Sequence, residues 1–338
     1  MSDSVELQRS VDELAARRLG AQAPVRALRA LTAGANKATW SFEALVEGQW
    51  RGFVLQRAAE AAALAPDAED DWLPMLVGAQ EFAAMIAAGE AGVPVPRVHA
   101  LLGADDPIGP GAITAQVEGE TLGPRIVRDA AFAAARNALT GQCARALAAV
   151  HAIAPARMPF LGRLGADETL ALYQRVLDGV ARPLPVIELA LRWGREHRPA
   201  NTRLAVVHGD FRTGNFIVGP EGLRAVLDWE VAHLGDPMED LGYLCMRTWR
   251  FGGAGPVGGF GPRAELLSAY QQASGQAVDP QAVRFWEVMG SVRWALGCVR
   301  RARSFRHQTR RRLEFAAVGR RLAEPAWDIL DLIEGRED

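Results

Sequence analysis

The sequence predicts a two-lobed α+β fold, in which a small antiparallel sheet lobe precedes a mostly helical large lobe. Strand-like runs separated by turns, with one helix among them, occupy the chain from about residue 25 to residue 117. From about residue 118 the apolar pattern becomes helical, apart from short strand-like runs between Leu204 and Asp228. The 338 residues leave room for a buried core in each lobe.

The small lobe is predicted element by element. Leu7, Val11 and Leu14 recur at helical spacing and predict an N-terminal helix within residues 1–24. We assign the small lobe itself to residues 25–117. It should contain three successive antiparallel strands at Leu28–Thr32, Trp40–Val46 and Gly52–Arg57. A helix should follow at Trp72–Gly89, and a further strand at Ala112–Val117.

The large lobe, residues 118–338, should be built from long helices. Arg128–His151 is Ala-rich and helical, Thr169–His197 holds one or two helices, and helices resume at Met238. Between them, three apolar runs bracket a loop that is dense in polar residues. These runs are Ala205–Val207, Phe216–Val218 and Ala225–Leu227.

The composition is that of an ordinary soluble globular protein, with 49% hydrophobic and 23% charged residues. A formal net charge of −2 creates no broad basic field, so we expect no nucleic-acid partner and no membrane partner. No run approaches the roughly 18 consecutive apolar residues of a membrane span, and the segment from Met1 to Leu19 does not resemble a signal peptide. Three widely spaced cysteines argue against a disulfide framework and favour a cytoplasmic location.

The polar loop carries the residues that phosphoryl transfer requires. His208-Gly-Asp210 is followed by Asn215 and, at the end of the third apolar run, by Asp228. Phosphoryl transfer needs a carboxylate that accepts or orients the hydroxyl proton, together with oxygen ligands that hold Mg²⁺ against the ATP phosphates. Asp210 would be the base or hydroxyl-orienting group, and Asn215 and Asp228 would be the Mg²⁺ ligands.

A purely structural interpretation exists for each of these residues. A single Asp or Asn often shapes a turn or caps an element. The combination of all of them, at this spacing and between strand-like runs, favours the catalytic interpretation. His208 is interpreted as a brace for the loop and not as a base.

These residues carry a family resemblance. From about Leu31 to Tyr243 the chain resembles the aminoglycoside phosphotransferase and choline kinase-like family, and within it the kinase-like domains related to those fused to acyl-CoA dehydrogenases. The resemblance rests on the His208 to Asn215 motif and on two further segments, Leu227-Asp-Trp-Glu230 and Gly235-Asp-Pro237. It implies a protein-kinase-like fold with ATP bound between the lobes.

The resemblance also implies a nucleotide site in the small lobe. The turn Gly34-Ala35-Asn36-Lys37 would cover the ATP phosphates with its backbone N–H groups. Glu81 would orient a cationic strand residue, and the backbone from Ala115 to Val117 would meet adenine. Asp236 is expected to fix the segment after the metal site, with a third metal-site carboxylate as the alternative. Glu230 could tune the metal site or brace the loop.

The strand that should carry a phosphate-binding lysine has none. Lys37 is the only lysine among the 38 Lys and Arg residues. Adjacent strand residues point to opposite faces, so either Gln56 or Arg57 could occupy the lysine position. We expect Arg57, because its guanidinium can contact phosphate and pair with Glu81. The alternative has Gln56 pointing inward while Lys37 reaches the phosphates.

The C-terminal region is rich in arginine, with Arg293 at the start of a tract that extends to Arg312. The tract is interpreted as a solvated helix face, with an anion site for a phosphorylated or CoA-linked substrate as the alternative.

Taken together, the sequence predicts an ATP- and Mg²⁺-dependent phosphotransferase that acts on a hydroxyl group of a small molecule. A nucleotide-binding pseudokinase with a regulatory or scaffold role is the alternative. The missing strand lysine favours that alternative, whereas the intact set of Asp210, Asn215 and Asp228 disfavours it.

Overall fold

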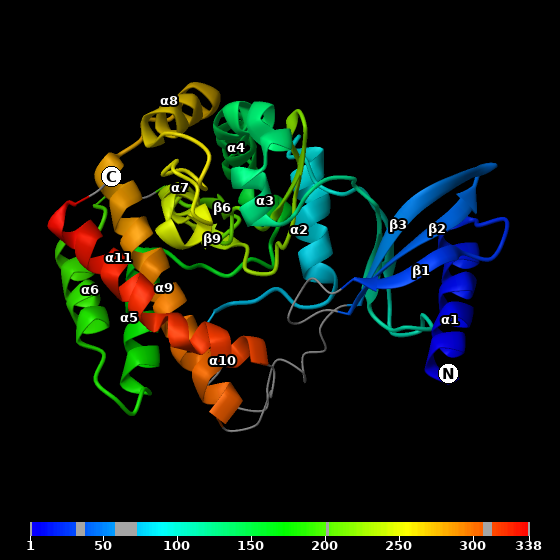
Figure 1. The fold of residues 1–338 in the computed structure, drawn as a ribbon, viewed down its shortest axis with the longest axis horizontal. Helices are drawn as coiled ribbons and strands as arrows, with labels where there is room; N and C mark the ends of the chain where they lie inside the picture. The colour runs from blue at the N-terminus through cyan, green and yellow to red at the C-terminus, as the bar shows by residue number, and fades with distance from the viewer. Residues whose placement is uncertain (1, 32–37, 58–72, 201–202, 307–312, 337–338) are drawn as a thin grey trace.

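The computed structural model describes residues 2–31, 38–57, 73–200, 203–306 and 313–336. In these ranges the chain forms a small lobe with an antiparallel sheet and a larger helical lobe (Figure 1). The predicted two-lobed α+β class is confirmed. No helix in the described ranges is long and apolar enough to cross a membrane.

The small lobe is a five-stranded sheet with the strand order β1-β2-β3-β5-β4. The β2–β3 hairpin turns through Glu47 and Gly48, which have φ values of 51° and 73°. Positive φ at both central residues is typical of the tight turn that matches strand twist. The strands are β1 (Arg26–Leu31), β2 (Thr39–Val46), β3 (Gln49–Arg57), β4 (Val98–Leu102) and β5 (Gly111–Ala115).

The two faces of this sheet pack against different partners. Helix α1 (Ser2–Leu19) lies on one face, where Leu14 packs with Phe53 and Leu55 of β3. On the opposite face, Ala112 of β5 belongs to the apolar cluster that contains helix α2 (Ala79–Glu90) and the core of the large lobe. Consecutive strand residues therefore face either α1 or the junction of the lobes.

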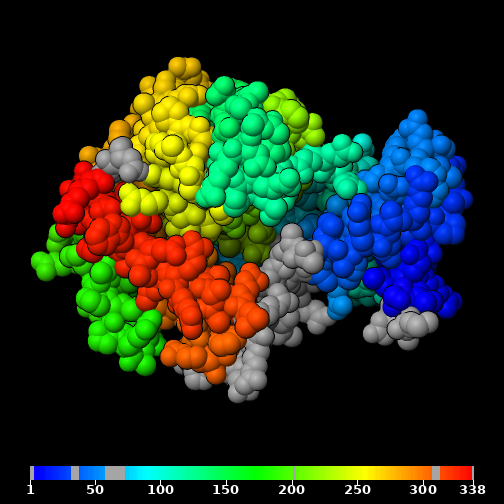
Figure 2. All heavy atoms as spheres, in the orientation of Figure 1, coloured from blue at the N-terminus to red at the C-terminus, as the bar shows by residue number. Residues whose placement is uncertain are grey.

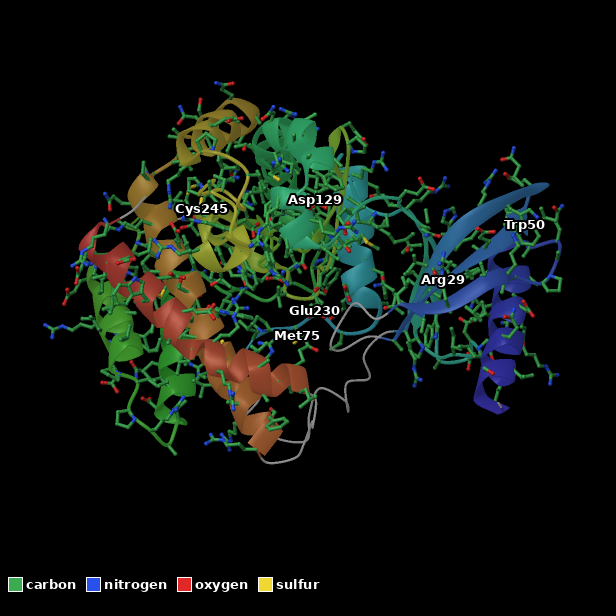
Figure 3. All side chains as sticks on the ribbon, viewed as in Figure 1. Arg29, Trp50, Met75, Asp129, Glu230 and Cys245 are labelled. Carbon is green, nitrogen blue, oxygen red and sulfur yellow. The ribbon has the colours of Figure 1, made fainter. Side chains whose placement is uncertain are left out.

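The helix predicted at Trp72–Gly89 begins later, as α2 at Ala79, and Trp72 lies outside the described residues. Pro74 disfavours the helical conformation at Leu73, the residue before it, so a helix that continues through Leu73 is disfavoured. In this segment the Leu76 N–H donates to the Glu230 carbonyl at 2.6 Å. Figure 3 shows Met75 and Glu230 close to each other where the lobes meet.

The large lobe is organised around the long helix α9 (Pro280–Arg306), which is mostly buried from Ala282 to Val299 (Figure 1). Most residues in this range are apolar, as in helices that lie in a core, and the buried charges of Glu287 and Arg293 form ion pairs. The other helices are α3 (Gly123–Arg128), α4 (Ala133–His151), α5 (Ala166–Asp178), α6 (Pro185–Glu196), α7 (Met238–Cys245), α8 (Arg263–Ser274), α10 (Leu313–Gly319) and α11 (Ala323–Glu334). The 3₁₀ turns are η2 (Ala130–Phe132), η3 (Pro155–Arg157), η4 (Arg247–Arg250) and η5 (Arg320–Leu322).

Two short strand pairs interrupt the helices, and three of their four strands overlap the runs that the sequence predicts. Strands β7 (Phe216–Gly219) and β8 (Gly222–Val226) form a hairpin, and β6 (Ala205–Val207) pairs with β9 (His233–Gly235). Strand β9 was not predicted, because three residues are too few to show a period. In Figure 2 the surface is hollowed between the teal segment of α3 and α4 and the orange-red segment of α10, with yellow-green atoms deeper inside.

Helix α7 crosses α9 at very close range, and Gly242 makes this possible. A Cβ atom at Gly242 would lie 2.6 Å from the Val283 carbonyl oxygen and 2.7 Å from the Glu287 nitrogen. Both are backbone atoms of α9 and cannot move aside independently. The close crossing therefore depends on glycine at this position.

We expect Gly242→Ala to lower the free energy of unfolding by about 1–3 kcal/mol, as overpacking of a core does. The matched control is Gly141→Ala in α4, where the nearest atom is the flexible end of Arg145 at 3.3 Å. That control should be neutral, or stabilising by up to about 1 kcal/mol through helix propensity. Denaturant unfolding of both variants measures the difference, and equal effects would show that the crossing tolerates a methyl group.

Candidate active site

The predicted catalytic residues lie at the ends of the short strands in the large lobe. Asp210 follows β6, Asn215 immediately precedes β7, and Asp228 follows β8. The Leu227 N–H donates to the Asn215 carbonyl at 2.8 Å, so Asn215 and Asp228 share one end of the β7–β8 hairpin. The structure thus brings all three residues together.

Asp210 is held by donors on both of its carboxylate oxygens. Arg212 Nε lies 3.1 Å from Oδ1 and 3.2 Å from Oδ2. Asn215 Nδ2 donates to Oδ2 at 2.6 Å, and Arg293 Nη2 approaches Oδ1 at 3.4 Å. Burial acts to raise the pKa of Asp210, but the charges of Arg212 and Arg293 outweigh it, and the pKa lies below its ordinary value. Asp210 is therefore a carboxylate at neutral pH, suited to orienting a hydroxyl group.

A second buried carboxylate, Asp240 of α7, fixes the backbone of the loop from His208 to Asn215, which we call the catalytic loop. Its Oδ2 accepts the His208 N–H at 2.8 Å, and its Oδ1 accepts the Gly209 N–H at 2.9 Å. His151 Nε2 lies 3.1 Å from Oδ2, and the Tyr270 hydroxyl lies 2.8 Å from Nδ1 of the same ring. Asp240 is fully buried, so the position of the loop depends on an ionic anchor inside the protein.

His208 braces the loop, in agreement with its predicted role. Its Nδ1 accepts the backbone N–H of Asp210 at 3.1 Å, and its Nε2 donates to the Leu227 carbonyl at 3.1 Å. Burial lowers the pKa of His208, which favours the neutral ring that this pattern requires. Its ring also packs against Trp229, with centroids 4.6 Å apart. His208 thereby joins the segment of Asp210 to that of Asp228.

The chemistry of Asn215 and Asp228 fits a magnesium ion. The hydrogen bonds of the Asn215 side chain to Asp210 use only Nδ2, which leaves Oδ1 to bind a cation. Asp228 has φ of 66°, an unusual conformation for a residue with a side chain and one that often marks functional positions. In the described ranges no cluster of three or more His, Cys, Asp or Glu could hold a metal. Two oxygen ligands from the protein suit Mg²⁺, which keeps waters and phosphate oxygens as its other ligands.

Asp236 does not take part in this site. Its Oδ1 accepts the Met238 N–H at 3.0 Å, and its Oδ2 accepts the Trp286 indole N–H at 2.8 Å. These bonds tie the start of α7 to α9, which agrees with the structural role expected for Asp236.

The residues predicted to bind nucleotide are placed only in part. Gly34, Ala35, Asn36 and Lys37 lie outside the described residues. Glu81 is buried in the first turn of α2.

The register of β3 separates Arg57 from the face that should hold the phosphates. Arg57 is exposed and lies on the same side of the strand as Phe53 and Leu55, the side toward α1. Gln56 pairs with Ala112 on the side toward α2. The structure therefore places Gln56, and not Arg57, on the face of the sheet toward Glu81.

Ala115 and Val117 lie where the small lobe joins the large one. The Ala115 N–H donates to the Arg97 carbonyl at 2.8 Å, so this N–H is already used within the sheet. Val117 follows the end of β5. Of these two residues, Val117 is the better candidate to offer a backbone N–H to a nucleobase.

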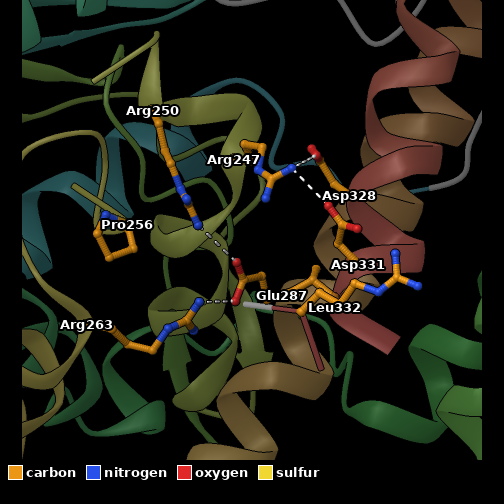
Figure 4. A pocket seen from close by; sticks show the side chains of 9 residues that line it. Arg247, Arg250, Pro256, Arg263, Glu287, Asp328, Asp331 and Leu332 are labelled. Carbon is orange, nitrogen blue, oxygen red and sulfur yellow. Dashed lines mark hydrogen bonds and ion pairs between the residues drawn. The ribbon is translucent and has the colours of Figure 1, made fainter. Parts of the chain in front are cut away.

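A separate pocket lies between η4, α8, α9 and α11 and is lined by charged pairs (Figure 4). Arg263 binds buried Glu287 at 2.7 Å, and Arg247 lies 3.4 Å from Asp328. Burial raises the pKa of Asp328 to about 6 in spite of Arg247. The lining of this pocket includes no residue of the catalytic loop. Its ion pairs hold η4, which carries Trp249, against α11.

The family comparison covers most of the chain. The model of the family described as "Phosphotransferase enzyme family" matches residues 27–286. This range includes the loop from His208 to Asn215 and all of the small-lobe sheet except Arg26, the first residue of β1. It extends further toward the C-terminus than the resemblance seen in the sequence.

Curated relatives match over shorter stretches. Acyl-CoA dehydrogenase family member 10 from Mus musculus is 45% identical over 65 residues, which are 19% of this chain and 6% of that protein. The Arabidopsis thaliana protein named "Probable acyl-CoA dehydrogenase IBR3" is 30% identical over 185 residues, which are 49% of this chain and 22% of that protein. The chain thus spans only a small part of the length of these relatives.

Solved structures share the fold over nearly the whole chain. A candidate aminoglycoside phosphotransferase from Ralstonia eutropha has a TM-score of 0.73 at 20% identity, covering 97% of this chain and 98% of that one. A choline/ethanolamine kinase family protein from Mesorhizobium loti has a TM-score of 0.62 at 20% identity, covering 96% and 98%. At these identities the likeness establishes the kinase-like fold.

The buried anchor of the catalytic loop can be tested by Asp240→Asn. An amide offers one acceptor oxygen in place of two, so a buried backbone N–H of His208 or Gly209 loses its partner. We expect unfolding to require about 1–3 kcal/mol less, and turnover to fall by about 10²-fold because the loop is displaced. The matched control is Asp236→Asn, which should lose similar stability but retain most of its turnover. Equal turnover in the two variants would show that Asp240 does not position the loop.

Proposed function

Because the chain belongs to the phosphotransferase enzyme family, we propose that it transfers the γ-phosphate of ATP to a hydroxyl group of a small molecule with the help of Mg²⁺. The observation that carries this proposal is the convergence of Asp210, Asn215 and Asp228 at one end of the β7–β8 hairpin. A protein that only bound nucleotide would not need a carboxylate at the position of Asp210, so the arrangement favours catalysis over a pseudokinase.

Each of the three residues has a distinct role in the proposed reaction. Asp210 accepts a hydrogen bond from the acceptor hydroxyl and orients its oxygen. As this oxygen forms a bond to the γ-phosphorus, the bond between that phosphorus and the bridging oxygen breaks, ADP leaves, and the hydroxyl proton passes to Asp210. Asn215 and Asp228 hold Mg²⁺ through their side-chain oxygens. When bound, the ion neutralises charge on the phosphates.

The nucleotide is proposed to lie between the lobes. Proteins of similar fold support this placement: aminoglycoside 2'-phosphotransferase-IIIa was solved with GDP, and APH(4)-Ia was solved with ADP and hygromycin B. For this chain we propose that the turn Gly34-Ala35-Asn36-Lys37 covers the phosphates and that the backbone near Val117 meets adenine. With Arg57 on the far face of β3, the charge at the phosphates is assigned to Lys37.

The proposed function is tested first by Asp210→Asn. The amide cannot accept the hydroxyl proton, so turnover should fall by about 10²–10⁴-fold while ATP binding persists. Turnover is measured by incubating the protein with ATP, Mg²⁺ and a panel of hydroxyl compounds, and by detecting the gain of one phosphate by mass spectrometry. Wild-type turnover in the variant would remove Asp210 from the mechanism. A wild-type protein that binds no ATP would refute the proposed function itself.

The variant Gln56→Lys tests whether Gln56 occupies the strand position at which kinases have a phosphate-binding lysine. The new ammonium would lie on the face toward Glu81, where kinases place their lysine, and we expect the KM for ATP to fall by about tenfold, the value of one charge-assisted hydrogen bond. Arg57→Ala, one residue along the same strand, is the matched control and should change the KM for ATP less than twofold. A large loss of ATP affinity in Arg57→Ala would restore Arg57 as the phosphate ligand.

A further inference from the structure

The carboxylate of Asp210 is tied to two helices of the large lobe. Two of its donors, Arg212 and Asn215, belong to the same loop as Asp210, so they cannot fix it relative to those helices. Among the described residues, the contacts from outside the catalytic loop come from Arg293 of α9, whose Nη2 lies 3.4 Å from Oδ1, and from the hydroxyl of Tyr243 in α7. The orientation of Asp210 therefore depends on how Arg293 is held.

Arg293 is the second member of a chain of alternating charges that begins at Asp210. Its other terminal nitrogen, Nη1, lies 3.9 Å from Oε1 of Glu239 in α7. The second oxygen of Glu239, Oε2, lies 3.0 Å from Nε2 of His233 in β9. Asp210, Arg293, Glu239 and His233 thus follow one another from the catalytic loop into the large lobe, and we call them the ion chain.

His233 meets acceptors at both of its ring nitrogens. Nδ1 lies 2.9 Å from the Val231 carbonyl oxygen, and Nε2 lies 3.0 Å from Glu239 Oε2. A neutral imidazole has a single N–H, so both contacts are hydrogen bonds only when the ring is protonated. Burial acts to lower the pKa of His233, but the charge and hydrogen bond of Glu239 outweigh it, and the pKa lies above its ordinary value. His233 therefore supplies the positive charge at the inner end of the ion chain.

The ion chain is shielded from water along most of its length. Side-chain exposure is 2% at His233, 8% at Glu239 and 9% at Arg293. Asp210, at the other end, is 17% exposed. Charges that are shielded from water need partners of opposite sign, because they have lost their hydration. Removing the charge of one member therefore leaves its neighbours unbalanced and favours their displacement.

The ion chain also contacts the backbone next to Asp210. Arg293 Nη2 donates to the Gly209 carbonyl at 2.6 Å. The ring of His233 packs against the same residue, since a Cβ atom at Gly209 would lie 3.2 Å from its Nδ1. The catalytic loop is thus held at two points, one residue before the catalytic carboxylate.

We propose that Glu239 and His233 are positioning residues for phosphoryl transfer, which act on Asp210 through Arg293. This inference rests on the proposed function. Glu239 and His233 hold the guanidinium of Arg293 against Asp210, and the carboxylate is thereby oriented toward the acceptor hydroxyl. A displacement of about 1 Å can cost about 10²-fold in rate. Because the ion chain acts on the carboxylate and not on ATP, its loss should lower kcat and leave the KM for ATP unchanged.

The first test is Glu239→Gln, which keeps the shape of the side chain and removes its charge. Phosphate transfer from ATP is measured in the presence of Mg²⁺, with the compound of the hydroxyl panel that accepts phosphate, or with water as the acceptor where no compound does. We expect kcat to fall about tenfold, whereas the KM for ATP stays within about twofold of its wild-type value. His233→Gln should lower kcat by a smaller factor, and it serves if Glu239→Gln does not fold.

A double variant separates positioning from a general loss of stability. Arg293→Met should lower kcat at least as much as Glu239→Gln, and the double variant should lose no more than Arg293→Met alone, because both changes act along one chain. Arg293→Lys keeps the positive charge and should recover part of the loss. The matched control is Asp106→Asn in the small lobe, where a buried carboxylate pairs with Arg18 at 2.7 Å. That control should lose stability and keep its kcat.

Three results would overturn the inference: wild-type kcat in Glu239→Gln, an equal loss of kcat in Asp106→Asn, or losses that add in the double variant. In each of these cases an active wild-type protein would leave the proposed function standing. A wild-type protein that transfers phosphate neither to a compound of the panel nor to water would refute the proposed function, and this inference with it.

Discussion

The candidate site depends on one buried carboxylate. Asp240 accepts the backbone N–H groups of His208 and Gly209 and hydrogen-bonds to His151. Burial acts to raise the pKa of Asp240, but the hydrogen bond and charge of His151, together with the other partners, hold it below its ordinary value. Because a buried charge is costly without such partners, the loop, α4 and α7 are coupled: displacing any one of them leaves an unpaired charge in the core.

The catalytic loop is supported in layers around this anchor. His208 links the loop to the end of β8 through the Leu227 carbonyl, and Asp236 secures the start of α7 to Trp286 of α9. Further out, Arg247 ties η4 to α11 by contacts to Asp328 and Asp331 at 3.4 and 3.2 Å. These contacts also hold Trp249 in the position where it supports Arg212. The geometry of the reacting groups thus reflects packing throughout the large lobe.

Arginine side chains supply positive charge around Asp210. Two guanidinium groups surround the carboxylate and keep its pKa low. One of them, Arg293, is buried and satisfied by the backbone and by Tyr243, whereas Arg212 is partly exposed on an aromatic face. Since a guanidinium remains charged at any physiological pH, the difference between the two lies in their surroundings. The same chemical group is thus held inside the protein in one position and partly exposed to solvent in the other.

The sequence by itself determined the class of fold and the central motif of the site, because periodicity and motif spacing are local properties. The short strands around Asp210, Asn215 and Asp228 followed directly from apolar runs and loop length. Tertiary structure decided which side chains meet them: Arg293 reaches Asp210 across 83 residues and His151 reaches Asp240 across 89. It also decided which face of β3 carries Arg57, since alternation predicts that Gln56 and Arg57 oppose each other but only packing against α1 and α2 shows which one faces the lobe junction. Contacts across such separations depend on how helices pack, and no local pattern in the chain records them.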